Sequence, residues 1–405
     1  MPLSLYLLAL AIFAMGTSEF MLAGLLPGIA ADLGVPVGTA GTLGSAFAIG
    51  MVLGAPLMAA LARTWPRRTG LAGLLVVFAA AHVAGALTPS FPMLFATRIV
   101  AALANAGFLA VALTTAATLV PPGRKGRALG VLLSGTTVAT VAGVPAGSVL
   151  GTVLGWRATF WAVVAVCLPA LLGILLAIPR RSGQPAAPAG PALRAELGCL
   201  ARPRLVLVMV LGALVNAATF ASFTFLGPVV TGTAGLGRLW ISVALVLFGA
   251  GSFVGVTVAG RLSDARPGLV VAVGGPLLLA GWPAAALLAG EPVALLCLVF
   301  VLGALSFAVG STLITRVLHE AASAPTMAGS YATAALNLGA AAGPPAAAIG
   351  LAASMRPTAA LWTSGLLVLV ALVVAAAGRG VLAVGRGVRR PAAVSQGGSR
   401  SSRRR

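Results

Sequence analysis

Acidic side chains are scarce in this sequence, which contains six Asp and Glu residues against 26 Lys and Arg. Charged residues of both signs make up only 8% of the chain, whereas a soluble globular domain carries about a quarter. Hydrophobic residues account for 60% of the 405 positions. This composition excludes an ordinary soluble domain and predicts an all-α polytopic membrane protein.

Cysteine and histidine are equally sparse. Cys167 and Cys297 fall within long apolar runs, and Cys199 lies in the polar central segment. No two cysteines lie together on the outer side of the membrane, so no disulfide is expected. The two histidines, His82 and His319, are far apart and have no Cys or carboxylate at ligand spacing. We therefore expect neither a metal site nor a cofactor.

The few titratable residues also bear on the class of protein. The six acidic residues and two histidines form no recognisable catalytic dyad. A membrane-embedded enzyme, which is the alternative from another class, would need such a cluster near an interface. A channel is a further alternative, but no ring-forming filter or charged pore helix is visible. A transporter is favoured.

Long apolar runs are what the sequence has in abundance, and a run of about 20 residues crosses a bilayer as a helix. Twelve are recognised, at roughly 4–26, 41–62, 70–88, 92–119, 128–152, 158–178, 205–230, 239–260, 269–289, 293–315, 326–350 and 357–378. The first run has no basic segment before it and no Ala-x-Ala site after it. It is therefore predicted to be a retained span and not a signal peptide.

The basic residues follow the topology of these spans. Of the 26 Lys and Arg, Arg98 lies within a span, and Arg157, Arg238 and Arg356 lie in loops on one side. The other 22 lie on the opposite side, which the positive-inside rule makes the cytoplasm. Both termini are then cytoplasmic, and the net charge of +20 does not indicate nucleic-acid binding.

The chain divides into two halves that repeat each other. Residues 1–179 form an N-terminal six-helix half and 204–378 a C-terminal one, with a cytoplasmic linker at 180–203 and a basic tail at 379–405 that is too polar to fold alone. Matched residues recur about 200 positions apart: Gly50 and Gly54 with Gly251 and Gly255, and Gly143 and Pro145 with Gly343 and Pro345. Parallel six-helix repeats predict a substrate site at mid-membrane between the halves.

Glu19 stands alone within the first apolar run. A charge at mid-helix costs about 2.5 to 3.5 kcal/mol on insertion scales, so its presence indicates a use. A carboxylate that takes up a proton inside the membrane would couple substrate movement to the proton gradient. The alternative is a permanently paired Glu that only holds two helices in register.

Three motifs resemble those of the major facilitator superfamily. The segment 260–267 (GRLSDARP) is similar to a loop motif whose acidic residue works with neighbouring Arg residues to hold the transporter in one conformation. The resemblance implies that Asp264 and Arg266 form such a conformational latch. The first-half copy departs from it, with Arg63 at the acidic position. Gly143, Pro145 and Gly147 resemble the Gly-Pro motif of the antiporters in this superfamily. Small residues here would allow close helix approach, and the proline would let the helix bend near the seal of the cavity. The alternative is ordinary tight helix packing.

Arg98 resembles the buried Arg of the antiporter motif in the fourth span, although Ala101 and Ala102 replace the polar residue and the glycine that follow there. Glu19 and Arg98 both lie about 10 Å from the outer ends of their spans, at 1.5 Å per residue. We expect the two side chains to face one aqueous pocket and to interact when Glu19 is ionised.

Polar and aromatic side chains along the fourth, seventh and eleventh spans are expected to line this pocket. They are Asn105, Asn216, Phe220, Phe223, Thr333 and Asn337. A mostly apolar cavity with a few amides and hydroxyls suits a small, largely uncharged ligand. For each Asn the alternative role is a hydrogen bond that joins two helices.

Whole segments extend the resemblance to nearly the entire chain. Residues 14–27, 143–147, 155–161 and 329–337 are similar to the actinobacterial chloramphenicol-resistance exporters, in the drug:proton antiporter branch of the superfamily. The resemblance implies twelve spans and proton-coupled efflux of a neutral drug by a monomer in the bacterial plasma membrane. Its partners would be the drug, protons and the lipid bilayer. Related sugar exporters have a Gly-Thr-x-Glu-Phe pattern like that of residues 16–20. Export of sugars or of another small metabolite is therefore the alternative function.

Overall fold

The described part of the computed structural model comprises residues 2–61, 65–121, 125–178, 196–265, 267–324 and 327–378. Within these ranges, twelve helices are long and apolar enough to cross a membrane. The basic tail and most of the predicted linker lie outside the described residues. The prediction of twelve apolar spans is confirmed.

The first half begins with a helix that is interrupted near its middle. Its elements are α1 (Leu3–Phe20), α2 (Leu22–Leu33), α3 (Val37–Leu61), α4 (Arg67–Leu87), α5 (Phe91–Thr118), α6 (Lys125–Val138), the π-helical turn η3 (Ala139–Gly143), α7 (Val144–Leu154) and α8 (Trp156–Ala177). The first span was predicted as one helix at 4–26, but it divides at Met21 and runs on to Leu33. Hydropathy marks the apolar length of a span and is insensitive to such a local change of helical path.

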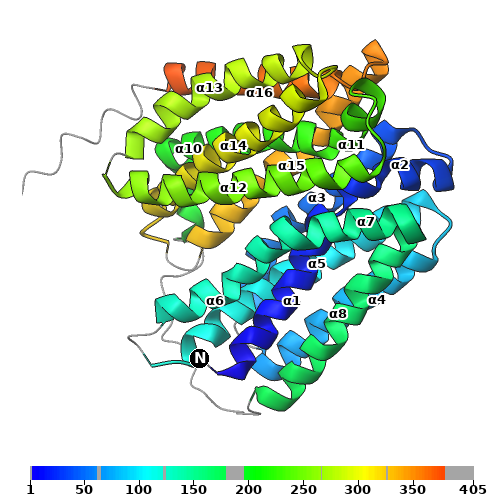
Figure 1. The fold of residues 1–405 in the computed structure, drawn as a ribbon. Coiled ribbons are helices and arrows are strands. Elements are labelled where there is room, and N and C mark those ends of the chain that lie inside the picture. The colour runs from blue at the N-terminus through cyan, green and yellow to red at the C-terminus, as the bar shows by residue number, and fades with distance from the viewer. Residues whose placement is uncertain are drawn as a thin grey trace, which may run out of the picture.

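The second half also contains six of the twelve candidate spans, with its π-helical turn at a different place. After the 3-10 turn η4 (Gly198–Ala201) come α10 (Pro203–Thr224), α11 (Leu226–Pro228), η5 (Val229–Thr233), α12 (Leu239–Ala265), α13 (Pro267–Leu287), α14 (Pro292–Glu320), α15 (Ala328–Ser354) and α16 (Ala359–Ala377). Its first helix is also interrupted, at Phe225. Figure 1 shows the two halves as separate bundles that come together where α2, α7 and α11 meet.

Glycines hold equivalent helix pairs together in both halves. A methyl group on Gly50 would lie 2.6 Å from Ala102 Cβ, and one on Gly54 would lie 2.9 Å from Ala106 Cβ, so α3 packs closely on α5. In the second half, Gly251 and Gly255 lie against the backbone of α14 in the same way. Close helix approach at small residues is a common packing mode in membranes. The repeat predicted from the glycine spacing thus corresponds to equivalent packing.

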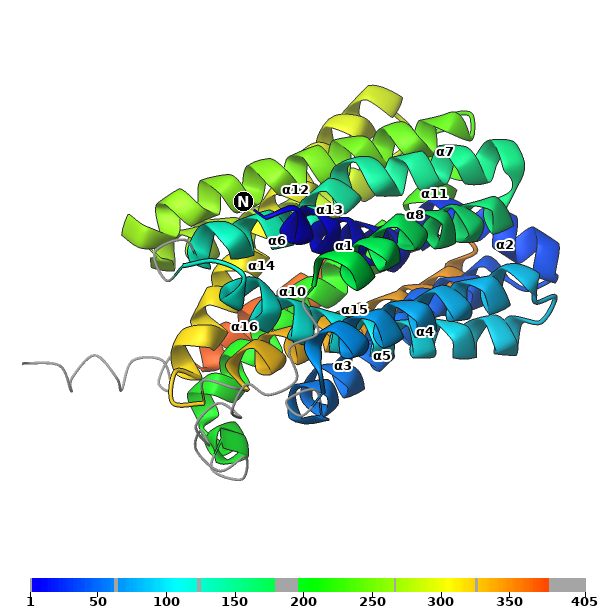
Figure 2. The same ribbon diagram turned by 90° about the horizontal axis from the view of Figure 1, so that it is seen from below.

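Besides smaller contacts of α2 with α10, α11 and α12, two pairs of helices join the halves. α3 packs on α15, and α7 packs on α12. Figure 2 shows these pairs on different sides of the molecule. The Ser330 hydroxyl donates a hydrogen bond to the Ala55 carbonyl across the first pair, at 3.4 Å. Next to the second pair, Gly249 of α12 meets the backbone of Thr140 in the turn η3 that precedes α7.

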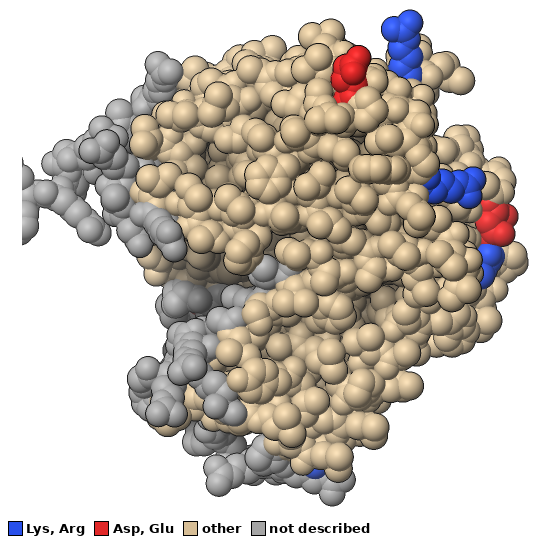
Figure 3. Space-filling view, viewed as in Figure 1, with Lys and Arg blue, Asp and Glu red and all other residues tan. Residues whose placement is uncertain are grey.

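The outer surface is apolar over most of its area. Large side chains are widely exposed on several helices, among them Leu172 at 60%, Leu176 at 86% and Ile349 at 72%. On the face in Figure 3 the visible charged side chains lie toward the edges, most of them at the end where α2, α7 and α11 meet. An apolar band between charged ends is the surface that a bilayer requires.

Candidate functional site

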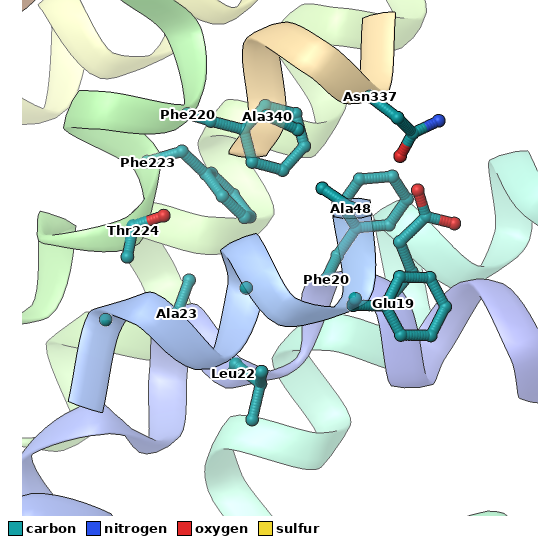
Figure 4. Close-up of a pocket in the computed structure, with 13 residues that line it drawn as sticks. Glu19, Phe20, Leu22, Ala23, Ala48, Phe220, Phe223, Thr224, Asn337 and Ala340 are labelled. Atoms are coloured by element: carbon teal, nitrogen blue, oxygen red, sulfur yellow. The ribbon is translucent and has the colours of Figure 1, made fainter. Parts of the chain in front are cut away.

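A cavity lies between the two halves and encloses about 400 Å³ of empty space, including the part open to solvent. Both halves contribute to its lining: Glu19, Phe20, Leu22 and Ala23 from α1 and α2, Gly41, Gly44, Phe47 and Ala48 from α3, Phe220, Phe223 and Thr224 from α10, and Asn337 and Ala340 from α15. Most of these side chains are apolar. Figure 4 shows how the labelled ones surround the space.

Small residues bring the lining helices together. Gly339 and Gly343 of α15 lie directly against the backbone of α10, near Ala213 and Ala217. A methyl group on Gly41 would come within 2.6 Å of Phe225 Cζ, so α3 approaches the end of α10 closely. These contacts place aromatic and amide side chains of the second half opposite α1.

Glu19 is the only acidic side chain among the described residues that line the cavity, and it is partly exposed there. It lies two residues before Met21, where α1 passes into α2. Its carboxyl group points toward α15 in Figure 4. A single titratable group is thus placed at the boundary between the halves.

Arg98 does not line this cavity. It is 1% exposed, and its guanidinium donates hydrogen bonds to the Ser18 hydroxyl at 2.8 Å and to the Ser18 carbonyl at 2.7 Å. Its Cζ atom lies 4.7 Å from the centre of the Phe47 ring. Arg98 is therefore one layer behind Glu19 and acts on it only electrostatically. This differs from the expected shared pocket, because the long side chain is held by the backbone of α1.

His82 also belongs to this region, although the sequence indicated neither a metal site nor a catalytic dyad for it. Its Nε2 atom lies 2.6 Å from the Ser18 hydroxyl, and its Nδ1 atom lies 2.8 Å from the Phe78 carbonyl. A lone His within an apolar span is as unusual as a lone Glu, and that signal could have identified it. No group of three or more His, Cys, Asp and Glu that could hold a metal ion occurs in the described ranges.

Three of the predicted cavity residues, Phe220, Phe223 and Asn337, line the cavity. Phe20 was missed: its ring centre lies 5.9 Å from that of Phe220 and 6.4 Å from that of Phe223, so an aromatic group spans both halves. The sequence shows Phe20 beside Glu19, but only the packed helices show that it faces α10.

The other predicted cavity residues are placed between helices or behind the lining. Asn216 donates a hydrogen bond to the Leu336 carbonyl at 2.7 Å, and Asn105 contacts the Met51 sulfur at 3.7 Å. Both are contacts between helices, which is the alternative role considered for them. The Thr333 side chain is not part of the lining, but its carbonyl accepts a hydrogen bond from Asn337 Nδ2 at 3.0 Å.

The Gly-Pro motif lies where η3 passes into α7. Gly143 lies directly against the Thr17 hydroxyl, and a methyl group on Gly147 would be 3.1 Å from the Thr159 methyl. Pro145 is buried in the first turn of α7. The π-helical turn changes the direction of this span beside α1, next to the segment that carries Glu19.

The predicted latch is only partly described. Asp264 was expected in a loop, but its backbone belongs to the last turn of α12, because the helix continues to Ala265. Arg266 lies outside the described residues. The described residues therefore include the end of α12 that carries Asp264, but not the side-chain contacts of this motif.

Part of the predicted linker is docked onto the second half. Glu196 is completely buried, its carboxylate accepts a hydrogen bond from the Met327 amide at 2.8 Å, and its carbonyl accepts one from the Tyr331 hydroxyl at 2.8 Å. The carboxylate thus lies at the start of α15, where helix amides lack partners. No local signal assigned a role to this segment, since its partners are about 130 residues away.

Comparison with known proteins agrees with this architecture. The family model of the Major Facilitator Superfamily matches residues 8–344. A solved structure of a bacterial homologue of the human lysosomal transporter Spinster, inward-facing and unoccupied, has a TM-score of 0.71 at 17% identity and covers 94% of this chain and 96% of its own. The twelve-helix chain is a membrane transporter, and it belongs to the Major Facilitator Superfamily.

Two curated relatives cover nearly the whole chain. A chloramphenicol resistance protein of Streptomyces lividans is 74% identical over 375 residues, which is 93% of this chain and 96% of the relative. The inner membrane transport protein YdhP of Escherichia coli K12 is 32% identical over 375 residues, covering 91% of this chain and 95% of the relative. The resemblance stated from the sequence segments is confirmed.

Proposed function

We propose that this transporter exports chloramphenicol from the bacterial cell in exchange for protons that bind to Glu19. The observation that carries the proposal is one acidic side chain in an otherwise neutral cavity between the two halves. The 74% identity to the Streptomyces lividans protein supports the choice of substrate. The family fold supports alternating access through the cavity.

The cavity chemistry suits a neutral aromatic compound. Phe20, Phe220 and Phe223 present ring faces and edges from both halves. Aromatic pairs contribute about 0.5 to 1.5 kcal/mol beyond the area they bury. The Asn337 amide and the Glu19 carboxyl supply the few polar contacts that orient a ligand.

Asn337 of the second half can link the protonation of Glu19 in the first half to the contact between the halves. Its Nδ2 atom donates to the Thr333 carbonyl, which can only accept, so its Oδ1 atom is the free acceptor, and Figure 4 shows it directed toward Glu19. A protonated Glu19 can donate a hydrogen bond to this oxygen, whereas a carboxylate is repelled by it. Protonation therefore stabilises the state in which the halves close around the cavity. A bound proton shifts the equilibrium only through such a difference between states.

The proton gradient can drive this exchange with one carboxyl group. A charge that moves through 100 mV releases about 2.3 kcal/mol, which corresponds to roughly a fiftyfold gradient of a neutral solute. We assign a monomer in the bacterial plasma membrane as the working unit, with both termini in the cytoplasm. The distribution of Lys and Arg supports this orientation.

Accumulation of labelled chloramphenicol in efflux-deficient bacteria tests the proposal. Cells that express the wild type should accumulate little drug, and a protonophore should abolish the difference. Glu19→Gln, which keeps a neutral group of similar size, should accumulate drug to the level of cells without the transporter. Glu291→Gln, at the exposed start of α14, is the matched control and should export normally.

Two outcomes would contradict the proposal. Full uphill export by Glu19→Gln at wild-type abundance would refute the coupling role of Glu19. Unchanged accumulation in cells with confirmed wild-type protein in the membrane would reject chloramphenicol as the substrate. A screen of sugars and other metabolites against the purified protein would then follow.

A further inference from the structure

A continuous chain of buried hydrogen bonds runs from α5 through α1 to α4. Arg98 donates to the hydroxyl and the carbonyl of Ser18, and the hydroxyl lies 2.6 Å from His82 Nε2. Ser18 is 0% exposed, and Arg98 and His82 are each 1% exposed. Ser18, the middle of this chain, directly precedes Glu19, the residue whose carboxyl group faces the cavity.

The partners fix the direction of each hydrogen bond. His82 Nδ1 lies 2.8 Å from the Phe78 carbonyl, which can only accept, so Nδ1 carries a proton. In the neutral ring Nε2 is then an acceptor, and the Ser18 hydroxyl donates to it. The Ser18 oxygen keeps its lone pairs for Arg98. A neutral His82 therefore orients the Ser18 hydroxyl to receive the guanidinium.

Among the described residues, the helices packed on α1, α4 and α5 carry few further titratable groups. Those near helix ends are Asp32, Arg67, Arg68, Lys125, Arg127 and Arg157, with Tyr6 near the start of α1 itself, and Cys167 lies within a span. The His82 ring packs between Phe78 and Phe160, at centroid distances of 4.3 and 5.6 Å. The charge that acts on Glu19 is that of Arg98.

The second half shows that the fold does not require this chain. Equivalent glycine contacts align the halves at offsets of 200 and 201, which places Ala218, Trp282 and Val299 at the positions of Ser18, His82 and Arg98. Trp282 and Val299 line a separate apolar cavity there. The described second half therefore packs without a charged or titratable chain at these positions, where the Ala218 carbonyl instead accepts a hydrogen bond from the Ser364 hydroxyl. The charged and titratable members of the first-half chain, Arg98 and His82, thus have a purpose other than packing.

We propose that His82 and Ser18 form a positioning pair that holds the Arg98 guanidinium beside Glu19 and so sets the pH range over which the transporter exchanges protons. The proposal rests on the proposed coupling role of Glu19. Without the acceptor at His82, the Ser18 hydroxyl is free to turn and Arg98 loses a fixed partner. A less well placed cation stabilises the Glu19 carboxylate less.

Four variants separate positioning from packing. His82→Phe keeps an aromatic ring between Phe78 and Phe160 but removes the acceptor. His82→Gln replaces the ring by an amide whose oxygen can accept from Ser18. Ser18→Ala removes the middle of the chain, and the double variant His82→Phe with Ser18→Ala tests whether the two residues act as one unit.

The first readout is proton-driven chloramphenicol export as a function of pH, normalised to the amount of folded protein. The profile of His82→Phe should move to higher pH by about one unit or more, which corresponds to about 1.4 kcal/mol of lost charge stabilisation. Ser18→Ala should move it in the same direction, and the double variant should move it no further. The pH profile of His82→Gln should stay close to that of the wild type.

The second readout is the infrared band of the protonated Glu19 carboxyl in reconstituted protein, assigned by its absence in Glu19→Gln. This band should persist to higher pH in His82→Phe, whether or not chloramphenicol is the substrate. An unchanged band in a folded His82→Phe protein would overturn the positioning role, as would an equal shift in His82→Gln. A shifted band together with full export by Glu19→Gln would refute the coupling role and leave the positioning role standing.

Discussion

The two halves of the transporter share a scaffold but differ in chemistry. In the first half, Arg98 lies over Phe47 and binds Ser18. At the equivalent places in the second half, Val299 lines an apolar cavity and Phe248 packs against Phe223, with a centroid distance of 4.9 Å. The fold therefore tolerates either a buried charge or an apolar cluster at this position.

The difference assigns separate tasks to the halves. The charged and titratable groups behind the cavity belong to the first half, whereas the second half contributes two rings and an amide to the lining. A proton and a neutral drug can then act on different sides of one interface. In the proposed function, coupling would arise because both ligands change the stability of the same contact between the halves.

The largest expected effect comes from removal of the buried charge. Arg98→Met should lower export by about tenfold to hundredfold, because charge-assisted hydrogen bonds of about 1.5 to 3 kcal/mol are lost. Val299→Met, at the equivalent position of the second half, is the matched control and should retain export. Initial rates in proteoliposomes measure both. Equal losses in the two variants would show that the position matters only for packing.

Truncation of the aromatic side chains should weaken binding of the drug without changing the pH dependence of export. Phe220→Ala and Phe223→Ala should each raise the apparent KM for chloramphenicol about tenfold, through loss of stacking and buried area. The pH profile of export should keep its position. Phe253→Ala, on the exposed surface of α12, should leave KM unchanged. A moved pH profile with unchanged KM would contradict the division of tasks.

Substitution of the packing glycines should damage both halves alike. Gly50→Val and Gly251→Val should each destabilise the protein by about 1 to 3 kcal/mol, since a side chain would overlap α5 or α14. Gly73→Val, where no atom lies within 4 Å of the added carbon, is the control. Thermal unfolding of the purified protein measures the effect. A large difference between Gly50→Val and Gly251→Val would show that the scaffold is less symmetric than its contacts.

The smallest effect is expected at the ion pair beyond the end of the first predicted span. Arg157 donates a hydrogen bond to Asp32 and holds the pKa of that carboxyl below its ordinary value of 3.8. The positions equivalent to these two in the second half are Gly232 and Pro357, which touch without a charge. Asp32→Asn should cost less than about 1 kcal/mol at neutral pH, because the pair is partly exposed.

This contribution has a defined pH dependence. A lowered pKa in the folded protein means that the stabilisation is present above the unfolded value and is lost as the pH falls through the folded one. The difference in unfolding temperature between wild type and Asp32→Asn should therefore begin to shrink below about pH 4 and disappear once the pH is below the folded pKa of Asp32. A difference that persists in acid would show that Asp32 acts through its shape and not through its charge.

Much of the architecture could be predicted from the sequence. Twelve apolar runs fix the spans because a bilayer leaves no partner for an unpaired backbone, so length and hydropathy suffice. The spacing of Gly50 and Gly251 predicted the repeat, and the isolation of Glu19 marked the cavity, since a charge within a span is costly wherever the helix packs. These signals are local in the chain.

The placement of side chains across helices was decided by the tertiary structure alone. Arg98 has the length to reach either the cavity or the backbone of α1, and packing selects the backbone. Phe20, His82 and Glu196 find their partners 64 to 200 residues away, on helices whose rotation hydropathy does not specify. The sequence by itself determined which segments cross the membrane and where a charge is buried. Only the packed helices decided which face each segment presents, because rotation about a helix axis depends on close contacts with its neighbours.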